Sequence, residues 1–255
     1  MERIQLPSKI SVIDQGEYQS DFVIEPCYPG YGTTLGNALR RVLLSSLPGA
    51  AVTAVKITGA THEFSTLPHV KEDMVDLILN IKGIRLQMFE GENAIISVKA
   101  KGEKVLTVGD LKCPANVEAK NPDHIIAHLT DKSAELEMEL TVGVGRGYIP
   151  VEIREKEKLD LGTIAIDAIY TPVRNVNFHV ENVRVGQMTN YDKVTISVKT
   201  DGTVSPTQAF LDSAKILEEH FQHLIASLPM PEEITKAVIL AEAKPKKRAK
   251  KEKEK

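Results

Sequence analysis

Apolar residues between positions 35 and 47 recur at the spacing of an amphipathic helix. Steps of three and four residues are the pattern of a helix with one face on a core, and they join Leu35, Ala38, Leu39, Val42, Leu43 and Leu47. Leu44 lies opposite this stripe, one turn beyond Arg40 and Arg41, so the pattern predicts an exposed leucine beside two guanidinium groups. We interpret this face as a contact surface for another protein. The alternative is an ordinary surface arginine pair beside a stray leucine.

A second apolar stripe predicts a long helix near the end of the sequence. Ser205, Pro206 and Gln208 are the residue types of an N-cap, a first helical position and a capping-box partner. The 3.5-residue repeat that follows is typical of helices packed lengthwise on each other, and its members are Phe210, Ala214, Leu217, Phe221, Leu224 and Leu228. The partner is a helix of a second chain, or the stripe covers the protein's own sheet.

Most of the remaining pattern predicts β-strands. Residues 4–24 have the character of extended segments, and after a break at Pro48 and Gly49 short strands are expected at 52–58 and 94–100, with a helix over 70–80. In the clearest strand, 134–142, apolar Leu136, Met138, Leu140 and Val142 alternate with Glu135, Glu137, Glu139 and Thr141. This period of two is that of a sheet with one solvated face. The charged residues 150–160 predict a surface loop.

Composition limits the class of protein. With 42% hydrophobic content, 255 residues are enough for one large core or two modest ones. No apolar run approaches the roughly 18 residues of a membrane span, and the first residues lack the apolar region of a signal peptide, so we expect a cytoplasmic protein without a membrane segment. Cys27 and Cys113 stand far apart in the sequence, which favours buried free thiols over a disulfide framework or a zinc site.

Charge is concentrated at the end of the sequence. From Lys244 to Lys255, eight Lys or Arg face two Glu, a net charge of +6, and the rest carries −9 of the total of −3. An acidic body is unlike an autonomous DNA-binding domain, which gains affinity by neutralising phosphates. The tail is therefore interpreted as disordered and solvated, with at most a weak direct contact to DNA.

Other candidate chemistry is sparse. Gly30, Gly32 and Gly36 open a helix and suggest phosphate binding, but their spacing fits neither a P-loop nor a dinucleotide-binding turn. Two histidine pairs have the spacing of metal ligands but lack obvious further ligands, namely His124 with His128 and His220 with His223. We predict no metal, no cofactor and no catalytic residue on this chain.

Residues 30–46, GYGTTLGNALRRVLLSS, closely resemble the first long helix of the alpha subunit of bacterial DNA-directed RNA polymerase. Further motifs of that family follow in order at 62–66, 72–83, 128–131, 145–150, 167–173, 192–193 and 201–203. The resemblance covers about residues 4 to 228, and so many ordered motifs make chance similarity a poor explanation.

The resemblance implies an α+β fold in two parts. Residues 1–49 and 167–230 are expected to form a discontinuous dimerisation domain, made of a sheet and two long helices. Residues 50–166 are expected to form an inserted, mostly β domain, and 231–255 a disordered basic tail. The family's usual C-terminal DNA-binding domain has no counterpart in the sequence and is expected to be absent.

The resemblance also implies a function without catalysis by this chain. Two copies would dimerise and scaffold the beta and beta-prime subunits of the polymerase, a nucleotidyltransferase whose magnesium is expected in the partner catalytic subunit and which contacts DNA as a holoenzyme. The family's beta contact carries over to Arg41 and Leu44. Its beta-prime contact carries over to Asp76, Lys82 and Ile166, although Asp76 and Lys82 have the alternative of being ordinary helix charges. The expected dimer interface comprises Leu35, Leu39, Val42, Leu43, Phe210, Ala214, Leu217, Phe221, Leu224 and Leu228.

Two other functions are compatible with parts of the sequence. A nucleotide-binding enzyme would use the turn from Gly30 to Gly36, and nucleotide-dependent thermal stabilisation would support it. A stand-alone nucleic-acid binder would depend on the Lys244 to Lys255 tail alone, and its binding would have to survive physiological salt.

Overall fold

The computed structural model describes residues 4–60, 62–154, 160 and 162–228, and the chain divides into two compact units, Met1–Ala214 and Lys215–Lys255. The described residues form three α-helices and fourteen strands, so the expected α+β class is confirmed. The domain limits predicted above, 1–49, 50–166 and 167–230, stay predictions. The tail from residue 231 onward lies outside the described residues.

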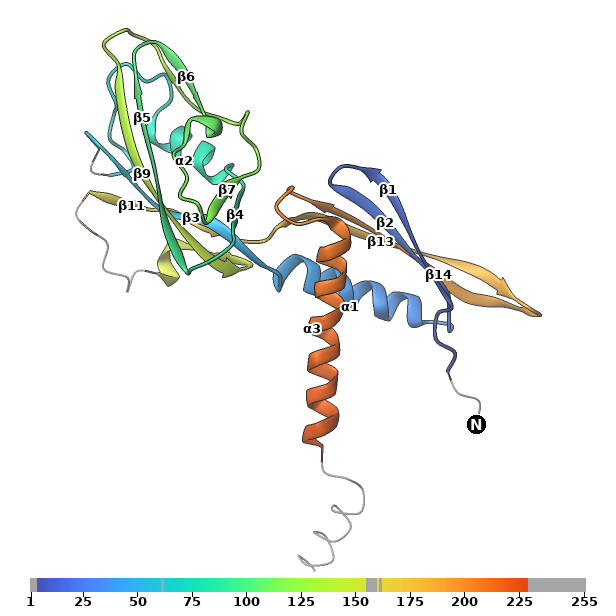
Figure 1. The fold of residues 1–255 in the computed structure, drawn as a ribbon. Coiled ribbons are helices and arrows are strands. Elements are labelled where there is room, and N and C mark those ends of the chain that lie inside the picture. Colours follow the sequence, from blue (N-terminus) through green and yellow to red (C-terminus); the bar gives the residue numbers. More distant parts are fainter. Residues whose placement is uncertain (1–3, 61, 155–159, 161, 229–255) are drawn as a thin grey trace, which may run out of the picture. The chain divides into compact units, whose positions relative to one another are not determined.

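The first sheet combines the beginning of the chain with its later part. Its antiparallel strands lie in the order β1 (Lys9–Gly16), β2 (Gln19–Cys27), β14 (Met188–Thr200) and β13 (Val173–Val185). Residues 4–24 were expected to be extended, and β1 and β2 account for most of them. Ile24 of β2 pairs with Val194 of β14, so the discontinuous organisation of this sheet is confirmed. Figure 1 shows these strands as a blue hairpin beside an orange one.

Helix α1 (Tyr31–Ser45) lies against β13 and β14 of this sheet. Its close approach depends on glycine, because a Cβ at Gly36 would lie 2.5 Å from Cδ2 of Phe178 and one at Gly32 would lie 2.9 Å from Cγ1 of Val180. Both glycines are buried together with Leu39 and Leu43. The backbone of α1 therefore packs directly on the side chains of β13.

Replacing Gly36 by alanine should destabilise the protein, although alanine is the better helix former. The propensity gain is about 1 kcal/mol, whereas overpacking against Phe178 costs about 1–3 kcal/mol, so we expect a net loss of about 1 kcal/mol measured by urea unfolding. Asn37→Ala is the matched control, since Asn37 is exposed on the same helix and should gain stability from the same propensity change. Equal stabilisation by both variants would contradict the close packing.

The second sheet contains six strands and most of the apolar core. Its order is β5 (Asn93–Lys101), β9 (Glu135–Arg146), β3 (Pro48–Ile57), β4 (Leu86–Met88) and β7 (Val117–Ala119), and β11 (Thr163–Ala165) also pairs with β3. Helix α2 (Met74–Lys82) contributes its buried face, Met74, Leu77 and Ile81, to this core. The alternation predicted for residues 134–142 is confirmed, because Leu136, Met138, Leu140 and Val142 are all buried.

Two short strand pairs and two 3₁₀ turns complete the first unit. Strand β6 (Lys104–Thr107) pairs with β8 (Ile125–Leu129), and β10 (Tyr148–Ile149) pairs with β12 (Ala168–Ile169). The turns are η1 (Val108–Asp110) and η2 (Val151–Ile153). Residues 150–160 were expected to be a loop throughout, whereas η2 interrupts them and 155–159 lie outside the described residues.

Two predicted boundaries differ from the structure for local reasons. The helix expected over 70–80 begins at Met74, because the carboxylate of Asp73 accepts a hydrogen bond from Asp76 N at 2.7 Å and caps the helix there. The break expected at Pro48 and Gly49 falls two residues earlier, at Ser46 and Leu47, since β3 begins at Pro48, opposite Arg146 of β9. A proline is tolerated at the first residue of a strand.

Helix α3 (Pro206–Ser227) begins in the first unit and continues into the second. Ser205 Oγ accepts a hydrogen bond from Gln208 N at 3.2 Å, which confirms the N-cap. The prediction that the Gln208 side chain completes a capping box is wrong, because its amide donates to Asp212 Oδ1 at 2.8 Å. None of the three helices in the described ranges combines the length and apolar character that a bilayer crossing requires.

Candidate functional site

A carboxylate from the sheet occupies the N-terminus of α1. Gly30 N and Gly32 N donate hydrogen bonds to Asp192 Oδ2 at 2.9 and 3.0 Å, and the Asp192 residue is buried. Gly30 has φ +84°, a left-handed conformation that favours glycine. These N–H groups are the ones that a phosphate would use. The glycine-rich turn therefore binds the protein's own carboxylate, which argues against the phosphate-binding interpretation.

The outer face of α1 carries the predicted arginine and leucine pair. Arg40 and Arg41 are exposed, but Leu44 is half-buried, so its predicted full exposure is wrong. The buried face includes Gly32 and Gly36, which an apolar pattern does not count, and they bring the centre of that face closer to Leu44. Leu44 thus lies at the flank of the packed surface, with part of its side chain free to contact another protein.

The dimer residues predicted on α1 divide into two groups. Leu39 is buried and Leu43 is 0% exposed within the chain's own fold, so neither presents appreciable surface to a second copy. Leu35 and Val42 are half-buried on the neighbouring flank. Of these four residues, Leu35 and Val42 leave side-chain surface that a second copy can contact, whereas Leu39 and Leu43 are buried beside them.

The predicted stripe on α3 changes from packed to exposed along the helix. In the first unit the ring of Phe210 stacks on Phe22 with centroids 4.2 Å apart, and Ala214 is half-buried. In the second unit Leu217 is half-buried and Phe221 is 59% exposed. Exposed large apolar side chains then continue to the end of the described residues, namely Leu224, Ile225 and Leu228. Ile225 falls outside the predicted repeat, but it lies beside Phe221 at an interval of four residues.

Helix α2 presents a mixed apolar and charged surface. Asp76 is exposed as predicted, and Val75 and Leu79 on the same helix are exposed as well. Val75 and Leu79 are not among the contact residues predicted from the sequence. The available signal was that α2 is apolar nearly all round its circumference, more than one buried face requires.

The other two residues of the predicted beta-prime set are less accessible. Lys82 Nζ lies 2.9 Å from Asp167 Oδ2, in an ion pair whose side chains are 25% and 28% exposed, so Lys82 is not an ordinary exposed charge. Ile166 is 1% exposed, and its side chain belongs to the core of the six-stranded sheet. A partner that binds here would meet the neighbours of Ile166 and not its side chain.

The carboxylate of Asp167 accepts hydrogen bonds from more than one segment of the chain. Its Oδ1 accepts a hydrogen bond from Val151 N at 3.0 Å. The hydrogen bond from Lys82, followed by that from Val151, holds the pKa of Asp167 below its usual range. On the adjoining residue, Arg154 Nη2 donates to the carbonyl oxygen of Ile166. Helix α2 and turn η2 are therefore joined by hydrogen bonds to one carboxylate.

Two of the four histidines considered as metal ligands form hydrogen bonds within the fold. His124 Nε2 lies 2.8 Å from the carbonyl oxygen of Asn80, and His128 Nδ1 lies 2.5 Å from Glu72 Oε1. Burial would raise the pKa of Glu72, but its hydrogen bonds with the His128 backbone and ring lower the pKa overall. His220 and His223 are exposed on α3. Within the described ranges, no group of three or more His, Cys, Asp and Glu side chains is arranged to hold a metal ion.

The two cysteines follow the sequence expectation of free thiols. Cys27 is buried and Cys113 is half-buried. Burial raises the pKa of both thiols, which makes the reactive thiolate less available.

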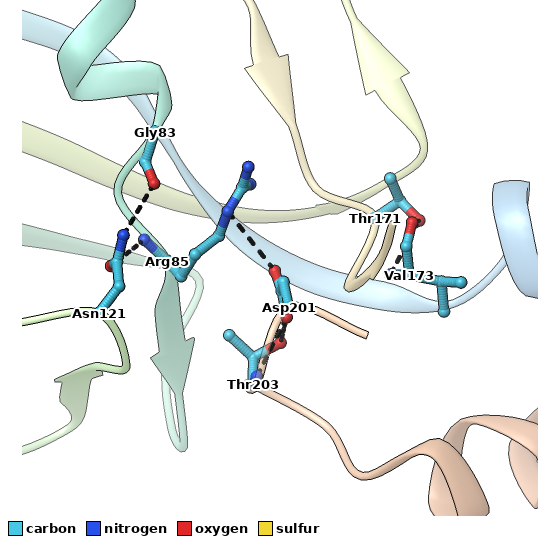
Figure 2. Close-up of polar contacts among 7 residues, drawn as sticks. All are labelled: Gly83, Arg85, Asn121, Thr171, Val173, Asp201 and Thr203. Carbon is cyan, nitrogen blue, oxygen red and sulfur yellow. Dashed lines mark hydrogen bonds and ion pairs between the residues drawn. The ribbon is translucent and has the colours of Figure 1, made fainter. Parts of the chain in front are cut away.

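A further buried ion pair was not anticipated from the sequence. Arg85, immediately before β4, places Nε 4.0 Å from Asp201 Oδ2, and both side chains are largely buried. Asp201 Oδ1 accepts hydrogen bonds from Thr203 N at 3.0 Å and from Thr203 Oγ1 at 2.6 Å (Figure 2). Arg85 N donates to Asn121 Oδ1 at 2.8 Å, and Asn121 Nδ2 donates to the carbonyl oxygen of Gly83 at 3.0 Å. The contact joins the start of β4 to the segment that follows β14.

Comparison with known proteins gives two kinds of match. The family model described as the RNA polymerase Rpb3/RpoA insert domain matches residues 55–171. The chain is 52% identical over 204 residues to the DNA-directed RNA polymerase subunit alpha of Alkaliphilus oremlandii, a match that covers 80% of this chain and 64% of the relative. It is 50% identical over 227 residues to the subunit alpha of Desulforamulus reducens, covering 88% of this chain and 71% of the relative.

A third relative agrees with these two. Identity to the subunit alpha of Carboxydothermus hydrogenoformans is 49% over 222 residues, covering 87% of this chain and 70% of the relative. The chain thus spans about two thirds of the length of the curated relatives that it matches.

Proposed function

Since this chain belongs to the alpha-subunit family of DNA-directed RNA polymerase, we propose that two copies dimerise and form the platform on which the beta and beta-prime subunits assemble. In this proposal the chain is a non-catalytic subunit of a cytoplasmic nucleotidyltransferase. The magnesium ion and the active site belong to the partner catalytic subunits. DNA is contacted by the assembled enzyme, with at most a weak contribution from the Lys244 to Lys255 tail, which lies outside the described residues.

The observation that carries the dimerisation proposal is the exposed apolar surface at the end of α3. Phe221, Leu224 and Ile225 are large side chains exposed on consecutive turns of α3, and the exposed Leu228 follows directly after its last residue. Contiguous apolar surface of this kind marks a contact site, and the 3.5-residue repeat favours another helix as the partner. A second copy supplies such a helix with the same repeat.

The proposed beta contact is not purely apolar like the surface on α3. It combines a charged and an apolar side chain on α1. The exposed guanidinium of Arg41 can bind a carboxylate with two parallel hydrogen bonds, and the half-buried Leu44 offers an apolar contact beside it. Arginine next to an apolar anchor is the composition of an interface centre. The resemblance assigns this same pair to beta.

Symmetry requires the two copies to differ in role. A twofold dimer presents every patch twice, whereas the proposed enzyme carries one beta and one beta-prime. One copy therefore uses its α1 patch, and the other uses its α2 patch with Asp76 and Lys82. The remaining patches are not filled by these two subunits.

The test compares Arg41→Ala with Arg40→Ala, a change of the neighbouring exposed arginine on α1. Each is mixed with the cognate beta subunit, and binding is measured together with molar mass by light scattering. We expect both variants to be dimers and only Arg41→Ala to lose beta, with affinity reduced about 30-fold, the effect of removing about 2 kcal/mol at an interface centre. Equal retention of beta by the two variants would remove Arg41 from the contact. A monomeric wild type that ignores beta would overturn the whole proposal.

A further inference from the structure

The four-stranded first sheet has one face covered by helices and one open face. On the covered face, Phe22 stacks on Phe210 of α3, and Phe178 lies against Gly36 of α1. Side chains alternate along a strand, so the residues between these belong to the open face. There the strand register forms two rows across β2, β14 and β13, namely Gln19, Lys199 and Asn175, and then Asp21, Ser197 and Asn177. The open face is therefore polar.

Two adjoining hollows on this open face form a trough. One has a volume of about 510 Å³ and is lined by Tyr18, Arg174, Asn175, Lys199, Thr200 and Asp201. The other, of about 260 Å³, shares Asn175 and Lys199 and continues to Asn177. Because they share two residues, the hollows are continuous across neighbouring strands, and we call them the open-face trough. A trough along a sheet suits an extended chain, whereas a compact small molecule binds in an enclosing pocket.

The open-face trough carries uncompensated positive charge. Arg174 and Lys199 are exposed, and in the described part of the chain neither forms an ion pair. The carboxylate of Asp201 is already engaged, since Arg85 Nε lies 4.0 Å from it and Thr203 N donates to it at 3.0 Å (Figure 2). Two free cations on one face favour a ligand with successive negative charges.

Two further carboxylates border the trough and limit its affinity. Glu17 Oε1 accepts a hydrogen bond from the Tyr18 hydroxyl at 2.8 Å, and Asp21 Oδ2 accepts one from Gln15 Nε2 at 3.0 Å. Both donors are neutral, so these carboxylates keep their negative charge. We therefore expect binding that is weak and sensitive to salt.

Amide and aromatic side chains add groups that recognise bases. Asparagine is unfavourable in strands, yet Asn175 and Asn177 are both exposed on the open face of β13. Their amides can donate to base edges and accept from them. The ring of Tyr18 is exposed and lies close to Gly202, where a Cβ would be 3.2 Å from Cε1 of the ring. An aromatic ring held in place is a stacking platform for an unpaired base.

We propose that the open-face trough binds single-stranded nucleic acid. Arg174 and Lys199 contact its phosphates. Asn175 and Asn177 contact base edges, and Tyr18 stacks on a base. A single strand is favoured over a duplex because its bases are free to reach the amides and the ring.

This site goes beyond the proposed function. It lies on the sheet face opposite α1, and it uses none of the residues assigned to dimerisation or to the beta and beta-prime contacts. With two free cations the contact is weak in the isolated chain. It becomes effective when an assembled polymerase holds a strand nearby and so raises its local concentration.

The experiment measures the affinity of the full chain for a short fluorescent single strand of mixed sequence, by anisotropy over a series of salt concentrations. Arg174→Gln combined with Lys199→Gln should weaken binding about 10-fold or more at low salt. The slope of log affinity against log salt should fall by about 1.4, about 0.7 for each phosphate contact. Lys99→Gln combined with Lys101→Gln is the matched control, because it changes two exposed lysines of β5 and the same net charge, and it should leave both quantities nearly unchanged.

Tyr18→Ala separates stacking from charge. It should weaken binding about 5-fold or more and leave the salt slope unchanged. Tyr18→Phe keeps the ring and should bind as wild type does, since the hydroxyl is engaged by Glu17. Asn177→Ala should weaken binding about 3-fold, as expected for a lost neutral hydrogen bond. Circular dichroism of every variant establishes that the fold is intact, and the exposed Arg174 and Lys199 carry the test if Tyr18→Ala fails to fold.

The outcomes that would overturn the inference are distinct. If the control pair weakens binding as much as the Arg174 and Lys199 pair does, net charge alone controls it. If neither pair has an effect, the trough is not the site. A duplex that binds as tightly as the single strand, or inorganic phosphate that displaces the strand at equal phosphate concentration, would remove single-stranded nucleic acid as the occupant. None of these results bears on the proposed function, which dimer mass and beta binding test separately.

Discussion

Asp192→Ala is expected to lower the free energy of unfolding by about 3 kcal/mol, the largest single-residue loss that we predict for stability. The change removes the acceptor of two backbone N–H groups, those of Gly30 and Gly32, at the start of α1. Hydrogen bonds to a charged group contribute about 1.5–3 kcal/mol each, and a donor left unpaired adds to the cost. The carboxylate also interacts favourably with the positive end of the helix dipole. Urea unfolding followed by circular dichroism measures the loss.

Asp192→Asn separates the charge from the shape. Asparagine keeps one acceptor oxygen, so it should lose about 1–2 kcal/mol, less than alanine does. Because α1 also carries Arg41 and Leu44, Asp192→Ala should bind beta more weakly than wild type does, even where light scattering shows that the variant is still a dimer. A loss below about 1 kcal/mol for Asp192→Ala would contradict the view that this carboxylate fixes α1 on the sheet.

Phe221→Glu combined with Leu224→Glu is expected to convert the dimer into a monomer. Both side chains are exposed in the single chain, so the substitutions should cost the monomer little stability. In a helix-to-helix seam each would place a carboxylate in an apolar contact, which is unfavourable unless it is paired. We expect the dissociation constant of the dimer to rise at least about 100-fold, as for the loss of two hot-spot residues. Light scattering over a concentration series gives the constant.

The control for this pair adds the same charge elsewhere on α3. His223→Glu changes an exposed residue on the face opposite Phe221 and Leu224, so it should leave the dimer intact. If His223→Glu dissociates the dimer as strongly as the double variant, net charge and not the apolar stripe controls association. A double variant that remains fully dimeric would remove this part of α3 from the interface.

Local patterns in the sequence predicted much of the fold. The alternation in β9 and the stripe on α3 depend on neighbouring residues alone, and both are present in the structure. The burial of α1 was less predictable, because Gly32 and Gly36 lie on its buried face and an apolar pattern passes over them. As a result, the exposure predicted for Leu44 was too high and surface was assigned to the buried Leu43.

Interactions between distant residues could not be predicted from periodicity. Asp192 and Gly30 are separated by 162 positions, and Lys82 and Asp167 by 85, so no local pattern indicates either contact. The pairing of strands far apart in sequence brings such residues together. The family resemblance implied Lys82 and Ile166 as contact residues, whereas the structure pairs Lys82 with Asp167 and buries the side chain of Ile166.

The central claim is that two copies of this chain hold one beta and one beta-prime subunit. Native mass spectrometry of a mixture of the three cognate proteins tests it most directly, because the mass of the intact complex counts each chain. The account predicts a single main assembly with two copies of this chain, one beta and one beta-prime. An assembly with one copy of this chain, or beta and beta-prime joined without it, would contradict the claim.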